Sequence, residues 1–86
     1  MKRTPLHEAV LGNKQSIVQI LVNNNADPNI QDTDGNTPVH YAAEMSYEEI
    51  FSTLMKSSTP INFTSKNNQQ MTVIDCIRDQ KIYEKI

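Results

Sequence analysis

The sequence predicts an all-α fold, a short solenoid of helix–turn–helix pairs from which β-hairpin or turn fingers project. The first observation is an internal repeat. The segment TPLHEAV at residues 4–10 recurs as TPVHYAA at 37–43, and Ile17 and Ile50 keep the same 33-residue spacing. The second is that each copy places apolar residues at the i, i+3, i+4 spacing of an amphipathic helix. Because one such helix pair cannot bury its apolar face alone, the units are expected to stack on one another.

The length of the chain allows a single domain. With 86 residues, a protein buries too little surface to enclose a large core and a deep cleft. A third, weaker copy of the motif, MTVIDCI, begins at residue 71, 34 residues after the second copy, so we expect one extra residue in the loop at 67–70. The expected domain covers residues 1–86, with repeat units at about 4–36, 37–70 and 71–86, the last one degenerate or truncated.

The first helix of each unit has a clear start. Thr4 and Thr37 are good N-cap residues, and Pro5 and Pro38 suit the first helical position. The Gly-Asn pair at 12–13 marks the break before the second helix of the first unit. The apolar residues expected to bury these helices are Leu6, Ala9 and Val10 in the first unit and Val39, Ala42 and Ala43 in the second.

The second helix of each unit is predicted from its apolar face. In the second unit Ser46 can cap this helix, and Glu49 stands three residues later, which is the spacing of a capping box. In the third unit only residues 81–86 remain for it. The residues expected to be buried are Ile17, Val18 and Leu21 in the first unit and Ile50, Phe51 and Leu54 in the second.

Polar turns connect the units. Asn25 can take the left-handed conformation that ends a helix. The segment DTDG at 32–35 is typical of a tight turn in which Gly35 supplies a positive φ. A calcium loop would need Gly at its sixth position and Glu at its twelfth, and this segment has neither. We therefore expect its carboxylates to accept backbone N–H bonds within the finger.

These motifs resemble ankyrin repeats. The Thr-Pro-Leu-His motif of that family matches residues 4–7 and, with Val for Leu, residues 37–40. Its Gly-Ala-Asp-x-Asn motif matches 25–29 with Asn for Gly, and its finger-tip motif Asp-x-x-Gly matches 32–35. The resemblance implies an L-shaped stack with projecting fingers and a concave groove that binds other proteins. The third unit departs from the pattern, because it lacks the Pro and the His and its finger lacks Gly.

The resemblance also implies where a protein partner would bind, because partners of this family touch the finger tips and the exposed positions of each first helix. Leu11 and Met45 are apolar where consensus repeats carry polar residues, and an exposed Met together with a Tyr is compatible with an adaptable anchor. The alternative, which we favour, is that lone exposed apolar residues are ordinary. The expected partner-binding residues are Thr33, Asp34, Asn36, Tyr41, Glu44, Met45, Leu11, Glu8 and Arg78.

The remaining reactive side chains are expected to be structural. His7 and His40 would each bond to the preceding Thr hydroxyl and to the adjacent loop, since a metal site would need further converging ligands. Cys76 takes a small buried position, and no base aligns with it. We therefore expect no enzymatic activity, no metal and no cofactor. The residues expected to maintain the repeat are Thr4, Pro5, His7, Thr37, Pro38, His40 and Gly35.

Composition disfavours several classes of function. A net charge of −2 argues against a nucleic-acid binder. No apolar run approaches the ~20 residues of a membrane span, and the first residues lack the apolar stretch of a signal peptide. A single cysteine fits a reducing compartment. We expect a cytoplasmic protein, with the nucleus as the alternative location.

The predicted function is a non-catalytic protein–protein interaction module that uses its concave helix face and finger tips, with a protein partner whose identity the fold does not give. The alternative is an accessory docking or regulatory segment of a larger enzyme or carrier, for example one that follows a lipid-binding, acyl-CoA-binding or kinase domain. The incomplete first and last units favour this alternative. The contacts expected in that case are other domains of the parent chain, or a second copy stacked on the uncapped ends.

Overall fold

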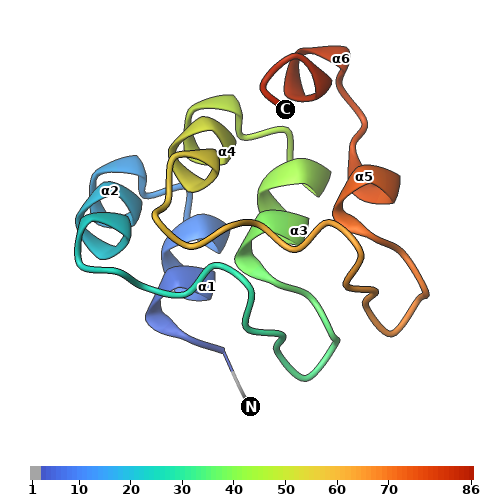
Figure 1. Ribbon diagram of the computed structural model, residues 1–86, viewed down its shortest axis with the longest axis horizontal. Coiled ribbons are helices and arrows are strands. Elements are labelled where there is room, and N and C mark those ends of the chain that lie inside the picture. Colours follow the sequence, from blue (N-terminus) through green and yellow to red (C-terminus); the bar gives the residue numbers. More distant parts are fainter. Residues whose placement is uncertain (1–2) are drawn as a thin grey trace.

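Helix pairs stacked side by side make up the protein. The computed structural model describes residues 3–86, and all regular elements in that range are helices, which confirms the all-α solenoid. Figure 1 shows the first helices of the pairs in one row and the second helices in a neighbouring row. The first helices are α1 (Pro5–Leu11), α3 (Pro38–Glu44) and α5 (Val73–Cys76), and the second helices are α2 (Gln15–Asn23), α4 (Glu48–Met55) and α6 (Gln80–Tyr83).

Threonine caps determine where α1 and α3 begin. Thr4 Oγ1 accepts the backbone N–H of His7 at 3.3 Å, and Thr37 Oγ1 accepts that of His40 at 3.2 Å. In both helices the histidine ring accepts the threonine N–H in return, which closes a capping box. The predicted starts of both first helices are thus confirmed.

The third first helix, α5, begins one residue later than the motif alignment predicts. Thr72, rather than Met71, occupies the N-cap position that Thr37 holds in the second unit. Asp75 takes the place of the histidine, because its Oδ2 accepts the N–H of Thr72 at 3.0 Å. A carboxylate therefore closes this capping box, and the helix starts without the Pro and His of the other copies.

The second helices α2 and α4 begin without a side-chain cap, whereas Asp79 caps α6 by accepting the Lys81 N–H at 3.0 Å. Ser46 does not cap α4: its φ of 57° places it in the turn, and Tyr47 occupies the N-cap without a side-chain hydrogen bond. The predicted capping box with Glu49 is therefore wrong. Ser46 and Glu49 have the spacing of such a box, but the left-handed backbone of Ser46 prevents it from acting as the N-cap. The helix predicted at 81–86 is also shorter and starts earlier, since α6 begins at Gln80 and ends at Tyr83.

The core lies between the two rows of helices, where the apolar residues predicted for α1, α3 and α4 are buried. Helix α2 differs. Val18 is buried, but Ile17 is 48% exposed, whereas Ile50, its counterpart in α4, is 1% exposed. Ile50 is buried because α4 packs between α2 and α6. Within residues 3–86 no helix pair precedes the pair α1 and α2, so α2 has a neighbour on one side only. The prediction that Ile17 is buried is therefore wrong.

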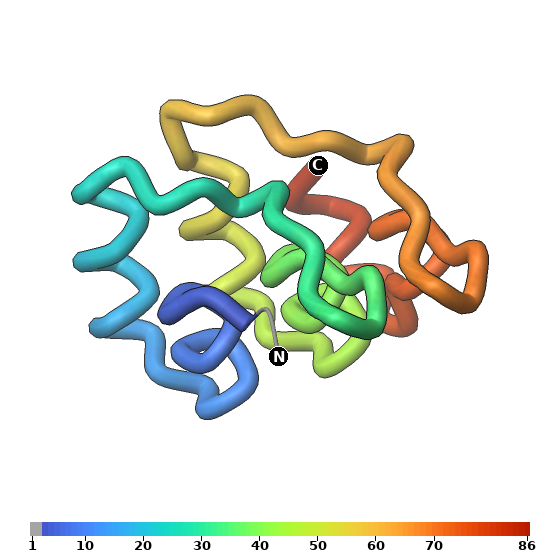
Figure 2. Tube along the Cα trace, turned by 90° about the horizontal axis from the view of Figure 1, so that it is seen from below, coloured from blue at the N-terminus to red at the C-terminus, as the bar shows by residue number. Residues whose placement is uncertain are grey.

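The fingers are turns, and no strand occurs in residues 3–86. Asp32 donates its N–H to the carbonyl of Asn36 at 2.8 Å, and Gly35, with φ of 79°, donates to the carbonyl of Asp32 at 2.9 Å. In the second finger Gln70 takes the left-handed conformation instead, with φ of 64°. Asn67 and Gln70 follow Asp32 and Gly35 by 35 residues, so the extra length lies before Asn67 and not at 67–70. Figure 2 shows both fingers at the same end of the molecule.

Candidate protein-binding surface

A polar cluster holds the first finger against α3. Asp32 Oδ1 accepts the N–H groups of Asp34 and Asn36 at 3.0 Å each, and the Tyr41 hydroxyl donates to Asp32 Oδ2 at 2.5 Å. Arg3 Nε lies 3.6 Å from the same Oδ2, and its guanidinium lies 5.8 Å from the centroid of the Tyr41 ring. Burial opposes ionisation of Asp32, but the hydrogen bonds outweigh burial and hold its pKa below the usual value. Asp32 therefore organises the finger as an anion.

Tyr41 is not exposed, contrary to our expectation. Only 6% of the residue is accessible, and its ring meets the ring of His7 edge-on at 6.0 Å. Burial and the bond to Asp32 raise the pKa of Tyr41. Its position on the helix was predicted correctly, but the finger folds back over it and takes up its hydroxyl group.

Each histidine of the repeated motif links its helix to the backbone just before the next first helix. His7 Nδ1 accepts the Thr4 N–H at 3.1 Å, and His7 Nε2 lies 2.8 Å from the carbonyl oxygen of Asn36. His40 makes the same two bonds one unit later, at 3.2 and 3.0 Å. A carbonyl oxygen only accepts, so Nε2 of each histidine carries a proton. Nδ1 accepts a backbone N–H and therefore carries none, so the imidazole is neutral. The hydrogen bonds predicted for both histidines are present, and burial lowers the pKa of His40.

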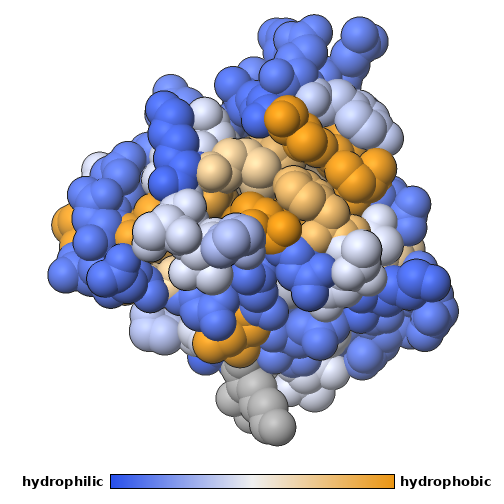
Figure 3. All heavy atoms as spheres, viewed as in Figure 1, coloured by the Kyte–Doolittle hydropathy of each residue, from blue (hydrophilic) through white to orange (hydrophobic). Residues whose placement is uncertain are grey.

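A polar pocket of about 370 Å³ lies between the two fingers and α3. Three of the expected partner-binding residues meet there, and two of them carry negative charge. Figure 3 shows polar side chains over most of this face, including the region of the fingers. Apolar side chains gather towards α4, α5 and α6. The residues that line the pocket are Asp34, Asn36, Glu44, Asn67, Asn68 and Gln69.

Hydrogen bonds from the second finger hold the first finger in place. Asn68 donates its backbone N–H to the carbonyl of Asp34 at 3.0 Å and its side-chain amide to the carbonyl of Thr33 at 2.9 Å. The side-chain amide of Asn67 donates to Asn36 Oδ1 at 2.8 Å. The pocket is therefore preformed. The importance of Asn67 was missed from the sequence, where the only signal was a polar run without glycine.

The other expected contact residues extend along the first helices. Glu8 is exposed, Leu11 is half-buried, and Met45 is 38% exposed at the end of α3. Arg78 Nη2 lies 3.9 Å from Glu44 Oε2, and both side chains are exposed. An exposed pair of this kind contributes little to stability, so both charges can be exchanged for those of a partner.

The reactive side chains are placed for packing. Cys76 is buried, and burial, with a smaller effect of Glu44, raises the pKa of its thiol. Across residues 3–86 no group of three or more His, Cys, Asp or Glu side chains could hold a metal ion. In the same range no helix has the length and apolar character needed to cross a membrane.

Comparison with known sequences agrees with this geometry. A family model described as ankyrin repeats, in three copies, matches residues 1–72. NF-kappa-B inhibitor alpha of Rattus norvegicus is 37% identical over 60 residues, which make up 70% of this chain and 19% of that protein. Neurogenic locus notch homolog protein 1 of Homo sapiens is 40% identical over 63 residues, 72% of this chain and 2% of that protein. The chain thus spans a small part of the length of these relatives.

Solved structures show the same architecture. The ankyrin repeat domain of Bcl-3, a member of the IkappaB protein family, superposes with a TM-score of 0.88 at 28% identity, covering 96% of this chain and 36% of that one. The Osh1 ANK domain from Kluyveromyces lactis gives a TM-score of 0.82 at 30% identity, covering 92% and 35%. Together with the helix pairs, their capped first helices and the fingers, these matches show that the chain belongs to the ankyrin-repeat family, whose repeats are protein–protein interaction modules.

Proposed function

We propose that this chain is a non-catalytic module that binds a protein partner in the pocket between its fingers. The observation that supports it is the preformed pocket, in which bonds from Asn68 to Asp34 and Thr33 hold the two fingers together before any partner arrives. A preformed site spends less free energy on ordering when it binds. Asp34 and Glu44 favour a partner segment with basic side chains.

The proposed contact surface continues from this pocket along the first helices. Met45 supplies an apolar anchor next to Glu44, and Leu11 and Glu8 extend the surface to α1. Arg78 adds a positive charge on the α5 side. We treat residues 1–86 as one domain, with units at about 4–36, 37–70 and 71–86, and expect it to meet its partner in the cytoplasm or nucleus.

Selection of peptides from a displayed random library tests the proposal without knowledge of the natural partner. Peptides enriched on the wild-type chain should bind the double variant Asp34→Lys, Met45→Ala at least about tenfold more weakly, a loss of ~1.4 kcal/mol. The matched control is Lys56→Ala at the end of α4, outside the proposed surface, and it should leave the dissociation constant unchanged. If the peptides bind the double variant as tightly as they bind the wild type, the assignment of the surface is refuted.

The alternative function is an accessory segment that docks on other domains of a larger enzyme or carrier, or on a second copy. The observation that favours it is the uncovered face of α2, where Ile17 is 48% and Ile20 is 58% exposed. An immunoblot of source cells with an antibody against this segment distinguishes the cases. A band near 10 kDa supports a free-standing module, and a much larger band supports the accessory segment. Sedimentation of the isolated chain as a monomer would exclude docking on a second copy.

A further inference from the structure

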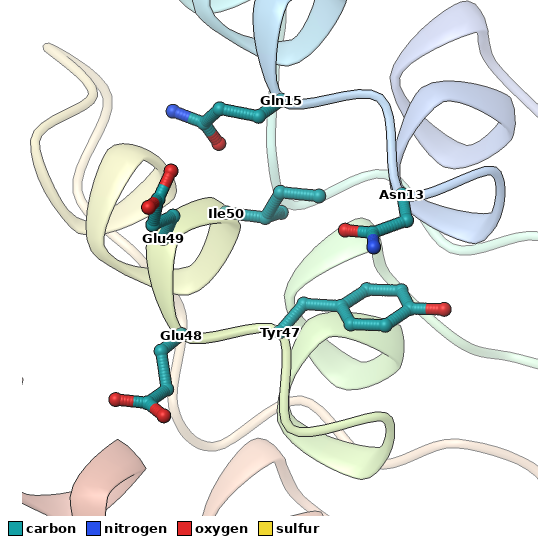
Figure 4. A pocket seen from close by; sticks show the side chains of 6 residues that line it. All are labelled: Asn13, Gln15, Tyr47, Glu48, Glu49 and Ile50. Atoms are coloured by element: carbon teal, nitrogen blue, oxygen red, sulfur yellow. The ribbon is translucent and has the colours of Figure 1, made fainter.

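A second pocket lies where α2 and α4 begin, and it shares no lining residue with the pocket between the fingers. Its volume is about 400 Å³. Figure 4 shows the side chains around it, with Ile50 forming the apolar floor between two polar walls. The residues that line it are Asn13, Gln15, Tyr47, Glu48, Glu49 and Ile50.

The hydrogen bonds of Thr53 fix how the Gln15 amide is turned. The Thr53 hydroxyl donates its single proton to the carbonyl of Glu49 at 2.9 Å. It can therefore only accept from Gln15, whose Nε2 lies 2.8 Å away. The other end of the amide, Gln15 Oε1, must point away from Thr53. This oxygen is buried and has no hydrogen-bond partner within residues 3–86.

A second acceptor faces this buried oxygen. In Figure 4 the Glu49 carboxylate and Gln15 Oε1 point towards one another across the pocket, whereas the Glu48 carboxylate points away. The Glu49 carboxylate is exposed, and neither ion pair found in residues 3–86 includes it. Two acceptors that face one another repel unless a donor lies between them, and a buried acceptor without a donor is costly.

The surroundings indicate that this donor carries positive charge. The pocket has two carboxylates and no basic side chain among its lining residues. Lys14, the residue before Gln15, runs along Gly12 instead, with its Cγ 3.3 Å from the position a Cβ would take there. Tyr47 also lines the pocket, with its ring beside Asn13, and aromatic rings attract cations.

We propose that this pocket binds the guanidinium group of an arginine side chain from a protein partner. A guanidinium has several N–H donors in one plane, so it can donate to Gln15 Oε1 and the Glu49 carboxylate together. A lysine ammonium is a point charge and lacks the fixed fork of donors that matches two neighbouring acceptors. The site does not depend on the groove between the fingers, because the two share no residue.

Titration of the ¹⁵N-labelled chain with the peptide acetyl-Gly-Arg-Gly-amide tests this assignment by NMR. The Gln15 side-chain amide is the reporter, since its position in the pocket separates binding there from binding at Asp34 or Glu44. We expect saturable shifts of that signal, with a dissociation constant on the order of millimolar. The same peptide with citrulline, which is neutral and similar in shape, should bind at least about fivefold more weakly.

Two isosteric variants provide the matched control. Glu49→Gln should weaken arginine-peptide binding at least about fivefold, because it removes the charge that faces Gln15. Glu48→Gln removes the same charge from a carboxylate that points away and should change binding less than about twofold. The proposal is overturned if the Gln15 signal does not saturate, if citrulline or lysine peptides bind equally well, or if the two variants behave alike. Circular dichroism verifies that both variants fold.

Discussion

Replacing Gly35 by alanine probes how the two fingers fit together. Gly35 has φ of 79°, a conformation that side chains with a Cβ rarely adopt. A Cβ at this position would lie 2.7 Å from both N and Oδ1 of Asn68 and 2.9 Å from Cα of Asn67. Two of these atoms are backbone, so the second finger would have to move away. The predicted result is a large loss of stability from one methyl group.

The magnitude follows from two contributions. The left-handed backbone costs a residue with a Cβ about 1–2 kcal/mol. Moving Asn68 away breaks its N–H bond to the carbonyl of Asp34, now 3.0 Å long, and a typical hydrogen bond contributes about 1 kcal/mol. We therefore expect Gly35→Ala to lower the free energy of unfolding by about 2–3 kcal/mol, which is a large part of the total for so small a domain.

Urea denaturation followed by far-UV circular dichroism measures this loss, and Gly12, the other glycine of the chain, provides the control. Its backbone φ is −82°, and an added Cβ would lie 3.3 Å from the Glu8 carbonyl oxygen and from Cγ of the flexible Lys14 side chain. Reduced entropy of the unfolded chain favours alanine there, so Gly12→Ala should change stability by less than about 1 kcal/mol. Equal losses for the two variants would refute the reasoning.

Two further predictions concern His40 and α2. Burial lowers the pKa of His40 below its usual 6.5, so its contribution to stability is complete above pH 6.5 and is lost as the pH falls from there through the lower pKa of the folded protein. Urea unfolding at pH 7.5 and 5.0 should show the lower stability at pH 5.0, and equal stability would contradict the neutral capping box. Ile50→Ala should cost about 2–5 kcal/mol by leaving a cavity, whereas Ile17→Ala should cost less than about 1 kcal/mol. Thermal unfolding of both variants checks this, and similar losses would show that Ile17 is covered in solution.

Features that depend on a few neighbouring residues were predicted well from the sequence. The Thr-Pro starts of α1 and α3, the positive φ of Gly35 and the hydrogen bonds of His7 were all expected, and all are present. Each of them is specified within one turn of backbone or by the repeat itself. The resemblance to ankyrin repeats likewise needed only the 33-residue period and its motifs.

The candidate binding surface was predicted less completely. Asp34, Asn36 and Glu44 do meet around one pocket, but Tyr41 lies under the finger, and Asn67 was not recognised. The reason is that these positions depend on contacts between segments far apart in the chain. The bond of Asn67 to Asn36 joins residues separated by 31 positions, and no local pattern announces it.

The sequence by itself determined that the chain folds as helix pairs with capped first helices in an ankyrin-like stack, because the repeat, these caps and the apolar spacing act over short distances. Only the tertiary structure decided which apolar positions are covered and which acceptors lack a donor. Ile17 and Ile50 occupy the same place in their units, yet one is exposed and the other buried. The unpaired oxygen of Gln15 follows from a bond to Thr53 in the next unit. Burial and pairing belong to the neighbours of a residue, and stacking of the units selects those neighbours.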